Sequence, residues 1–176
     1  MKRSALFQDR KAAGRALARE LAKREFVAPV VLALPRGGVP VAAEVARLLK
    51  APLDLVLVRK IGVPSQPELA AAAVVDGGEP EIVVNEEVVG LAGIDSDYLD
   101  RESKRELAEI ERRRQVYLQG RARVPLEGRT LIVVDDGIAT GASIRAALKA
   151  LKRKGPKALI LAVPVAPAAT VEQLAS

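Results

Sequence analysis

The sequence predicts an α/β protein in which helices flank both faces of a parallel central sheet. Three observations carry this prediction. Short, continuously apolar runs recur along the chain, as in parallel strands that are buried on both faces. Segments with apolar residues at helical spacing follow most of these runs. Loops containing Gly or Pro separate strand from helix, and such alternation is typical of a parallel sheet.

The first third of the chain reads as a helix followed by a strand, a loop, a helix and a second strand. Leu and Ala at helical intervals among charged residues indicate the first helix, and unbroken apolar runs indicate the strands. The expected elements are a helix over 4–25, a strand over Val30–Leu34, a loop over Pro35–Pro40, a helix over Val41–Leu49 and a strand over Leu53–Val58 that ends in Arg59-Lys60.

The middle of the chain is less regular, and we expect a small irregular insertion over residues 62–120. It contains a loop over Gly62–Pro67, two short strands at Ala70–Val75 and Glu81–Asn85 that form a hairpin, and a helix over 95–119. We interpret Arg112-Arg113-Arg114 in that helix as a solvated face. Residues 1–61 and 121–176 form the core of a single domain that spans residues 1–176.

The last third returns to strands alternating with helices. The expected elements are a strand over Thr130–Val134, a loop over Asp135–Gly141, a helix over Ala142–Lys152, a strand over Leu159–Val163 and a helix over Ala168–Ser176.

Composition excludes several kinds of chemistry. The chain has no His, Cys or Trp, so no Ser-His-Asp or Cys-His nucleophile, no zinc site of the usual kinds and no disulfide can form. The net charge of +6 favours an anionic partner. Aromatic residues make up only 2%, which disfavours nucleic acid because its single strands bind by stacking on aromatic side chains. We therefore expect a phosphorylated small molecule.

The chain carries no sign of membrane insertion or export. Its charged N-terminus lacks the apolar stretch of a signal peptide, and no apolar run reaches the ~20 residues of a membrane span. We expect no membrane partner and a cytoplasmic location, and leave the possibility of a homo-oligomer open.

The strongest motif is the segment from Leu131 to Ser143, LIVVDDGIATGAS. Two adjacent carboxylates, Asp135 and Asp136, follow a buried strand, and a Gly-containing loop then opens into a helix. Amides at a helix N-terminus bind phosphate, whereas carboxylates suit vicinal sugar hydroxyls or a hydrated divalent cation. Phosphate beside vicinal hydroxyls describes ribose 5-phosphate.

A plain structural alternative is that the acids only cap the following helix, as a lone Asp often does. Two acids in tandem before Gly-x-x-Thr-Gly fit capping poorly. The loop also lacks the Gly-Lys-Ser/Thr of a nucleoside-triphosphate loop and the Gly-x-Gly-x-x-Gly of a dinucleotide fold.

These thirteen residues resemble the phosphoribosyl-pyrophosphate (PRPP) signature of the type I phosphoribosyltransferases, whose fold is Rossmann-like. The resemblance implies that Asp135 and Asp136 contact the ribose hydroxyls and lend negative charge near the reacting carbon. It also implies a 5′-phosphate loop made of Gly137, Ile138, Ala139, Thr140, Gly141, Ala142 and Ser143.

A second segment supports the resemblance. Leu34 to Pro40, LPRGGVP, is similar to the family's pyrophosphate loop, which implies that Arg36, Gly37 and Gly38 bind pyrophosphate. In relatives a peptide bond of this loop is often cis without proline, which turns amides toward the pyrophosphate. A basic residue after the next strand commonly approaches the same group. Here it would be Lys60, and a solvated strand-end Lys is the alternative.

The resemblance implies an Mg²⁺-dependent enzyme of nucleotide metabolism. A nitrogen acceptor, a nucleobase or a related small molecule, would displace pyrophosphate from C1 of PRPP through an oxocarbenium-like transition state. We expect no direct protein ligand to Mg²⁺, which PRPP and water would hold near Asp135 and Asp136.

Two alternatives from other classes remain open. One is a PRPP-sensing regulatory domain that has lost its chemistry. The other is a phosphatase or phosphoacceptor that uses Asp135 or Asp136 as a nucleophile and binds Mg²⁺ directly. The residues of the insertion do not match any base-specific branch of the family.

Overall fold

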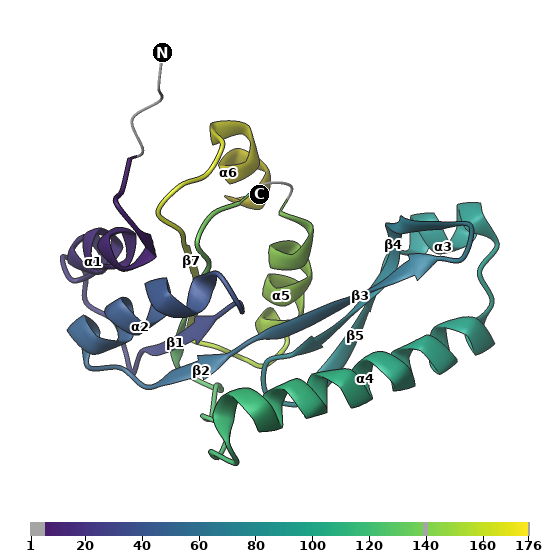
Figure 1. Ribbon diagram of the computed structural model, residues 1–176, viewed down its shortest axis with the longest axis horizontal. Coiled ribbons are helices and arrows are strands. Elements are labelled where there is room, and N and C mark those ends of the chain that lie inside the picture. The colour runs from purple at the N-terminus through teal and green to yellow at the C-terminus, as the bar shows by residue number, and fades with distance from the viewer. Residues whose placement is uncertain (1–5, 139–140, 176) are drawn as a thin grey trace. The chain divides into compact units, whose positions relative to one another are not determined.

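The structure is a computed structural model that describes residues 6–138 and 141–175, and the chain divides into two compact units (Figure 1). The first unit contains the described residues of Met1–Leu55, Val124–Gly141 and Gly155–Ser176. The second contains Val56–Arg123 and Ala142–Lys154. The single-domain organisation expected from the sequence stays a prediction.

A four-stranded parallel sheet forms the centre of the first unit. β1 (Val30–Ala33) lies between β2 (Leu53–Leu55) and β6 (Thr130–Val134), and β7 (Ala158–Ala162) pairs with the far side of β6. Every residue of β1 and β6 is buried, as their unbroken apolar runs require. The predicted parallel sheet is confirmed.

Helices of the first unit pack in a stack on this sheet. α2 (Gly38–Leu49) packs against β1, and α1 (Arg10–Leu21) packs against α2. A Cβ on Gly14 of α1 would lie 2.8 Å from the carbonyl oxygen of Val41, so only glycine allows the two helices to approach so closely. The third helix of this unit, α6 (Ala168–Ala175), follows β7.

A three-stranded antiparallel sheet forms the centre of the second unit. Its strands, in order, are β3 (Leu57–Val63), β4 (Gln66–Asp76) and β5 (Pro80–Val84). Ile110 of α4 (Ser96–Leu118) is 1% exposed and packs against Leu57 and Ile61 of β3. The unit also contains α3 (Glu86–Ala92) and α5 (Ala142–Lys152).

The middle of the chain is more regular than the sequence indicated. The strand expected over Leu53–Val58 is two strands in different sheets, β2 and β3, separated at Val56. Lys60 therefore lies inside β3 and not at a strand end. The expected loop over Gly62–Pro67 shrinks to a two-residue turn, because β3 and β4 pair antiparallel from Leu57↔Asp76 to Val63↔Gln66.

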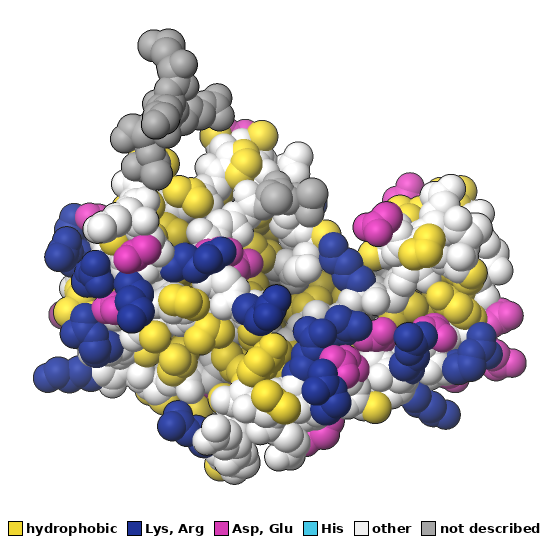
Figure 2. Space-filling model, viewed as in Figure 1, with side chains coloured by type: hydrophobic (Ala, Val, Ile, Leu, Met, Phe, Trp, Pro, Cys, Tyr) yellow, Lys and Arg dark blue, Asp and Glu magenta, His cyan; other side chains and the backbone are white. Residues whose placement is uncertain are grey.

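The arginine run of α4 only partly forms the solvated face expected from the sequence. Arg112 is exposed, but Arg114 is buried and lies 3.4 Å from Asp76, whose side chain is inaccessible to solvent. Basic and acidic side chains alternate over the outer surface of α4 (Figure 2). Within the described residues, no helix is both long and apolar enough to cross a membrane.

Candidate functional site

The two sequence motifs meet at the carboxyl ends of adjacent parallel strands. Ala33 of β1 is in register with Val134 of β6, and the Leu34 amide donates to the Val134 carbonyl at 3.0 Å. The chain then leaves β1 as the Pro35–Gly38 segment and leaves β6 as Asp135-Asp136. These two strand ends therefore lie side by side at one edge of the sheet.

Two glycines allow the loops to touch. A Cβ on Gly37 would lie 2.6 Å from Oδ1 of Asp136, and a Cβ on Gly38 would lie 2.6 Å from the carbonyl oxygen of Val134. Neither contact is possible for a residue with a side chain in this arrangement. The glycines therefore have a packing role within the site, in addition to the ligand contact that the resemblance implies.

The loop after β1 presents free donors. The peptide bond between Pro35 and Arg36 is cis, as the resemblance led us to expect. The amide of Gly38 donates to the Leu34 carbonyl at 3.0 Å, whereas the amides of Arg36 and Gly37 have no acceptor among the described residues. The Arg36 side chain is exposed and forms no ion pair within that part of the chain. Arg36 and Gly37 can thus offer a cation and two amides to an anion.

The two carboxylates are held differently. The amide of Asp136 donates to Oδ1 of Asp135 at 2.8 Å. Burial raises the pKa of Asp135 to about 6; the hydrogen bond from the Asp136 amide opposes this rise, and the Asp136 carboxylate adds to it. Asp136 instead accepts a hydrogen bond at Oδ2 from Nε of Arg10, at 2.8 Å. Sequence reasoning missed Arg10, because its partner lies 126 positions away along the chain.

The loop after β6 is held by the segment after β7. The Ile138 amide donates to the Val165 carbonyl at 3.3 Å. Gly141 has φ +74, a left-handed conformation that favours glycine, and faces the side chains of α6. Of the other expected phosphate-loop residues, Ala139 and Thr140 lie outside the described residues, and Ala142 and Ser143 begin α5 in the second unit.

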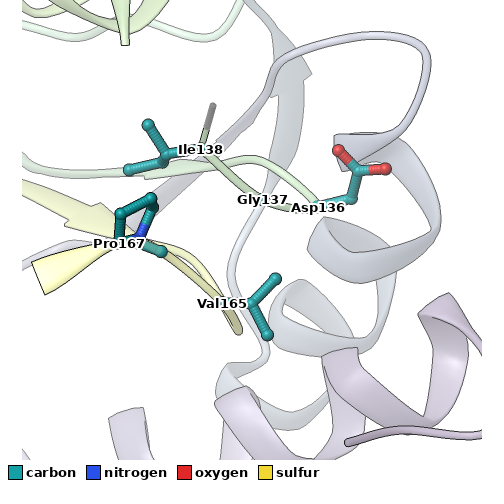
Figure 3. A pocket seen from close by; sticks show the side chains of 6 residues that line it. Asp136, Gly137, Ile138, Val165 and Pro167 are labelled. Carbon is teal, nitrogen blue, oxygen red and sulfur yellow. The ribbon is translucent and has the colours of Figure 1, made fainter. Parts of the chain in front are cut away.

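A pocket of about 460 Å³ lies beside the acid pair. The described residues that line it are mostly apolar, Asp136 alone among them being charged, and they are Asp136, Gly137, Ile138, Val165, Ala166 and Pro167. In Figure 3 the side chains of Ile138, Val165 and Pro167 lie around the backbone at Gly137, and the Asp136 carboxylate lies to their right. The pocket can take a flat, weakly polar group next to a carboxylate.

Lys60 belongs to the second unit. It lies on β3 with an exposed side chain, next to Arg59, which pairs with Glu106 of α4 at 2.6 Å. Its expected role toward pyrophosphate stays a prediction.

A comparison against protein families gives a match over nearly the whole chain. The model of the "Phosphoribosyl transferase domain" matches residues 4–174 of this chain. The chain belongs to this family. The acid pair, the loop after β1 and the pocket are therefore features of a phosphoribosyl transferase domain.

Relatives of this phosphoribosyl transferase domain carry the same family name. A Mycobacterium tuberculosis (strain H37Rv) protein named "Putative phosphoribosyl transferase Rv0571c" is 49% identical over 162 residues, which cover 92% of this chain. The chain spans about a third, 36%, of the length of that relative.

Solved structures share the fold. The crystal structure of TT1426 from Thermus thermophilus is 46% identical, with a TM-score of 0.82 over 96% of this chain and 79% of that one. A hypoxanthine phosphoribosyltransferase from Staphylococcus aureus is 11% identical with a TM-score of 0.55, covering 97% of this chain and 70% of its own, and shows likeness of fold alone.

Proposed function

We propose that this phosphoribosyl transferase domain binds PRPP and transfers its 5-phosphoribosyl group to a nitrogen acceptor. The acceptor is a nucleobase or a related small molecule, and pyrophosphate is released. The observation that carries the proposal is the contact between Gly37 and the Asp136 carboxylate. It joins a loop whose Arg36 and Gly37 amides and Arg36 guanidinium have no acceptor among the described residues to a pair of carboxylates. A phosphorylated sugar requires these two kinds of group side by side.

The chemistry needs no covalent nucleophile. The lone pair of the acceptor nitrogen forms a bond to C1 as the C1–oxygen bond breaks, and the oxygen leaves with its electron pair as part of pyrophosphate. A proton carried by that nitrogen passes to solvent. Arg36 and the amides of Arg36 and Gly37 stabilise the charge that develops on this leaving group. Asp135 and Asp136 accept hydrogen bonds from the ribose hydroxyls and place negative charge near the cationic carbon.

The pocket beside Asp136 is our candidate for the acceptor. Ile138, Val165 and Pro167 provide apolar surface for a planar ring, and their position next to the acid pair leaves the ring beside the ribose. The Val165 carbonyl accepts a hydrogen bond from the Ile138 amide, and this bond fixes the two pocket segments relative to each other.

We propose Mg²⁺ as the cofactor, bound to PRPP and to water near the acid pair. Carboxylate oxygens suit this hard cation or its water ligands, so the donor set of Asp135 and Asp136 fits. When bound, Mg²⁺ would neutralise charge on the pyrophosphate. We place the activity in cytoplasmic nucleotide metabolism.

Two measurements test the proposal. Calorimetry should detect binding of PRPP in the presence of Mg²⁺ by the wild type, and a screen of nitrogen heterocycles should then find one that causes release of pyrophosphate. The double variant Asp135→Asn plus Asp136→Asn is the matched control. No binding of PRPP would refute the proposal, whereas binding without pyrophosphate release from any acceptor would favour the regulatory alternative.

A further inference from the structure

Arg10 stands in an unusual place for a basic residue. It is the first residue of α1, which has no acidic residue in its first turn. A cation at the N-terminus of a helix is opposed by the helix dipole, so local helix stability gives no reason for an arginine here. Its Nε instead lies 2.8 Å from Oδ2 of Asp136.

The position of Arg10 is fixed by packing on both sides. Asp9 caps α1 by accepting from the Ala12 amide, which sets where the helix begins. Gly14 then presses the same helix against Val41 of α2. The Asp9 cap and the Gly14 contact together fix the position of α1, and this places Arg10 beside Asp136.

The ion pair between Arg10 and Asp136 affects the geometry of the site more than it affects the stability of the fold. The side chains of Arg10 and Asp136 are 62% and 31% exposed, and exposed ion pairs contribute little to the free energy of unfolding. However, Asp136 has a like charge, Asp135, as its neighbour, and the backbone of Gly37 against its carboxylate. The Arg10 guanidinium offsets the repulsion between the two carboxylates and holds Oδ2 of Asp136 in place.

We propose that Arg10 is a positioning residue that holds the Asp136 carboxylate, charged and in a fixed orientation, for the ribose hydroxyls of the bound ligand. The inference rests on the proposed function, since it presumes that Asp136 meets a ribose. In the described part of the chain, the charged neighbours of Asp136 are Asp135, which follows β6, and Arg10 of α1, and Arg36 lies in the adjoining loop.

The test compares two arginines of one helix. Arg10→Met removes the pair with Asp136. Arg15→Met removes an equal charge from α1 at a residue whose ion pair, at 3.9 Å, is with Glu44 of α2. Binding of PRPP and of pyrophosphate, each with Mg²⁺, is measured by calorimetry for both variants and for Arg10→Lys. Thermal melts confirm that each variant is folded.

We expect Arg10→Met to weaken PRPP about tenfold, or ~1.4 kcal/mol, because the Asp136 carboxylate would no longer be held in one orientation for the ribose hydroxyls. Arg15→Met should bind PRPP as the wild type does, and Arg10→Lys should recover part of the loss. Pyrophosphate, which has no ribose, should bind both Met variants equally. Equal effects of the two Met variants on PRPP, or an equal loss of pyrophosphate and PRPP in Arg10→Met, would overturn the positioning role.

A titration without ligand separates the two possible failures. The pH titration is followed by the carboxyl ¹³C signal of Asp135, which is assigned by its loss in Asp135→Asn. The pH midpoint of this titration should be higher in Arg10→Met than in the wild type, because Arg10 no longer offsets the charge of Asp136. If the wild type binds PRPP but this midpoint does not move, only the positioning role fails. If the wild type binds no PRPP, the proposed function fails and the positioning role falls with it.

Discussion

The backbone of Gly37 lies so close to the carboxylate of Asp136 that residue 37 cannot carry a side chain unless Asp136 moves. A Cβ at that position would be 2.5 Å from Cγ and 2.6 Å from Oδ1 of Asp136. Gly37 itself has ordinary helical angles, φ −62 and ψ −37, which any residue can adopt. The requirement for glycine therefore comes from the acid pair and not from the backbone.

This contact predicts that the effect of Gly37→Ala on the free energy of unfolding depends on whether Asp136 is present. Gly37→Ala should destabilise the wild type by about 1–3 kcal/mol, the usual cost of overpacking. In an Asp136→Ala background the same change should be neutral or stabilising, because alanine restricts the unfolded chain more than glycine does. Urea unfolding of the four proteins measures the coupling.

Gly38→Ala is the matched control. Its Cβ would meet the backbone carbonyl of Val134 at 2.6 Å, which the Asp136 substitution does not remove. Gly38→Ala should lower the free energy of unfolding equally in the wild type and in Asp136→Ala. If Gly37→Ala also destabilises both proteins equally, the carboxylate is not the group that requires glycine at position 37.

The acid pair should be needed for ribose and not for phosphate. In Asp135→Asn plus Asp136→Asn, two charge-assisted hydrogen bonds to hydroxyls become neutral ones, and each loses about 1 kcal/mol or more. PRPP affinity should fall at least tenfold, since ~1.4 kcal/mol is one decade. Calorimetry with inorganic phosphate should show equal or tighter binding, because nearby negative charge is removed.

The same double variant addresses helix capping. Asn caps a helix about as well as Asp, so a capping role predicts unchanged PRPP affinity and an unchanged melting temperature. Parallel loss of PRPP and phosphate would also count against the ribose role, because it would indicate a site that is disrupted as a whole.

The raised pKa of Asp135 predicts opposite pH trends for binding and stability. A ribose hydroxyl donates best to the carboxylate, so PRPP affinity should fall as the pH drops through about 6. The folded protein holds a proton that the unfolded chain releases above 3.8, so the contribution of Asp135 to stability is full below 3.8 and is lost as the pH rises through about 6. Calorimetry measures the PRPP affinity and urea unfolding measures the stability between pH 4 and 8. Asp135→Asn cannot titrate at this position, so it should remove the Asp135 contribution from both pH profiles.

Asp76 and Arg114 form a buried ion pair in the second unit, with side chains 0% and 7% exposed, and Arg123 also pairs with Asp76. Arg114→Met should destabilise the protein by about 1–3 kcal/mol, because the buried Asp76 carboxylate loses one of its two guanidinium partners and keeps Arg123 as the other. Arg112→Met, two positions earlier on the same helix but exposed, should change stability little. Urea unfolding compares them, and similar losses for both would show that burial of the pair does not matter.

The parts of the site that the sequence predicted are those with local patterns. Val30–Leu34 and Thr130–Val134 are unbroken apolar runs, so their burial in adjacent parallel strands and the position of the acids after them followed directly. The resemblance implied that Gly37 binds pyrophosphate, but nothing in the sequence shows that the Asp136 carboxylate lies against its backbone.

The parts that escaped prediction depend on partners far away in the chain. Nothing near residues 53–63 shows that Val56 separates strands of two sheets, because the second sheet is defined by pairing with β4. Arg114 resembles its neighbours Arg112 and Arg113 until Asp76 is placed against it. Arg10 looks like any other charge on an amphipathic helix.

The pairing of β1 with β6 also has a consequence during synthesis of the chain. Val31 is hydrogen-bonded to its neighbouring strand through residues near Ile132, which leave the ribosome about 100 residues later. At 5–20 residues per second the edge of β1 that β6 will cover stays open for ~5–20 s. An unpaired, wholly apolar edge strand is prone to aggregation. The nascent protein is thus most vulnerable before its acid pair exists, at a stage when no sugar phosphate could yet protect it.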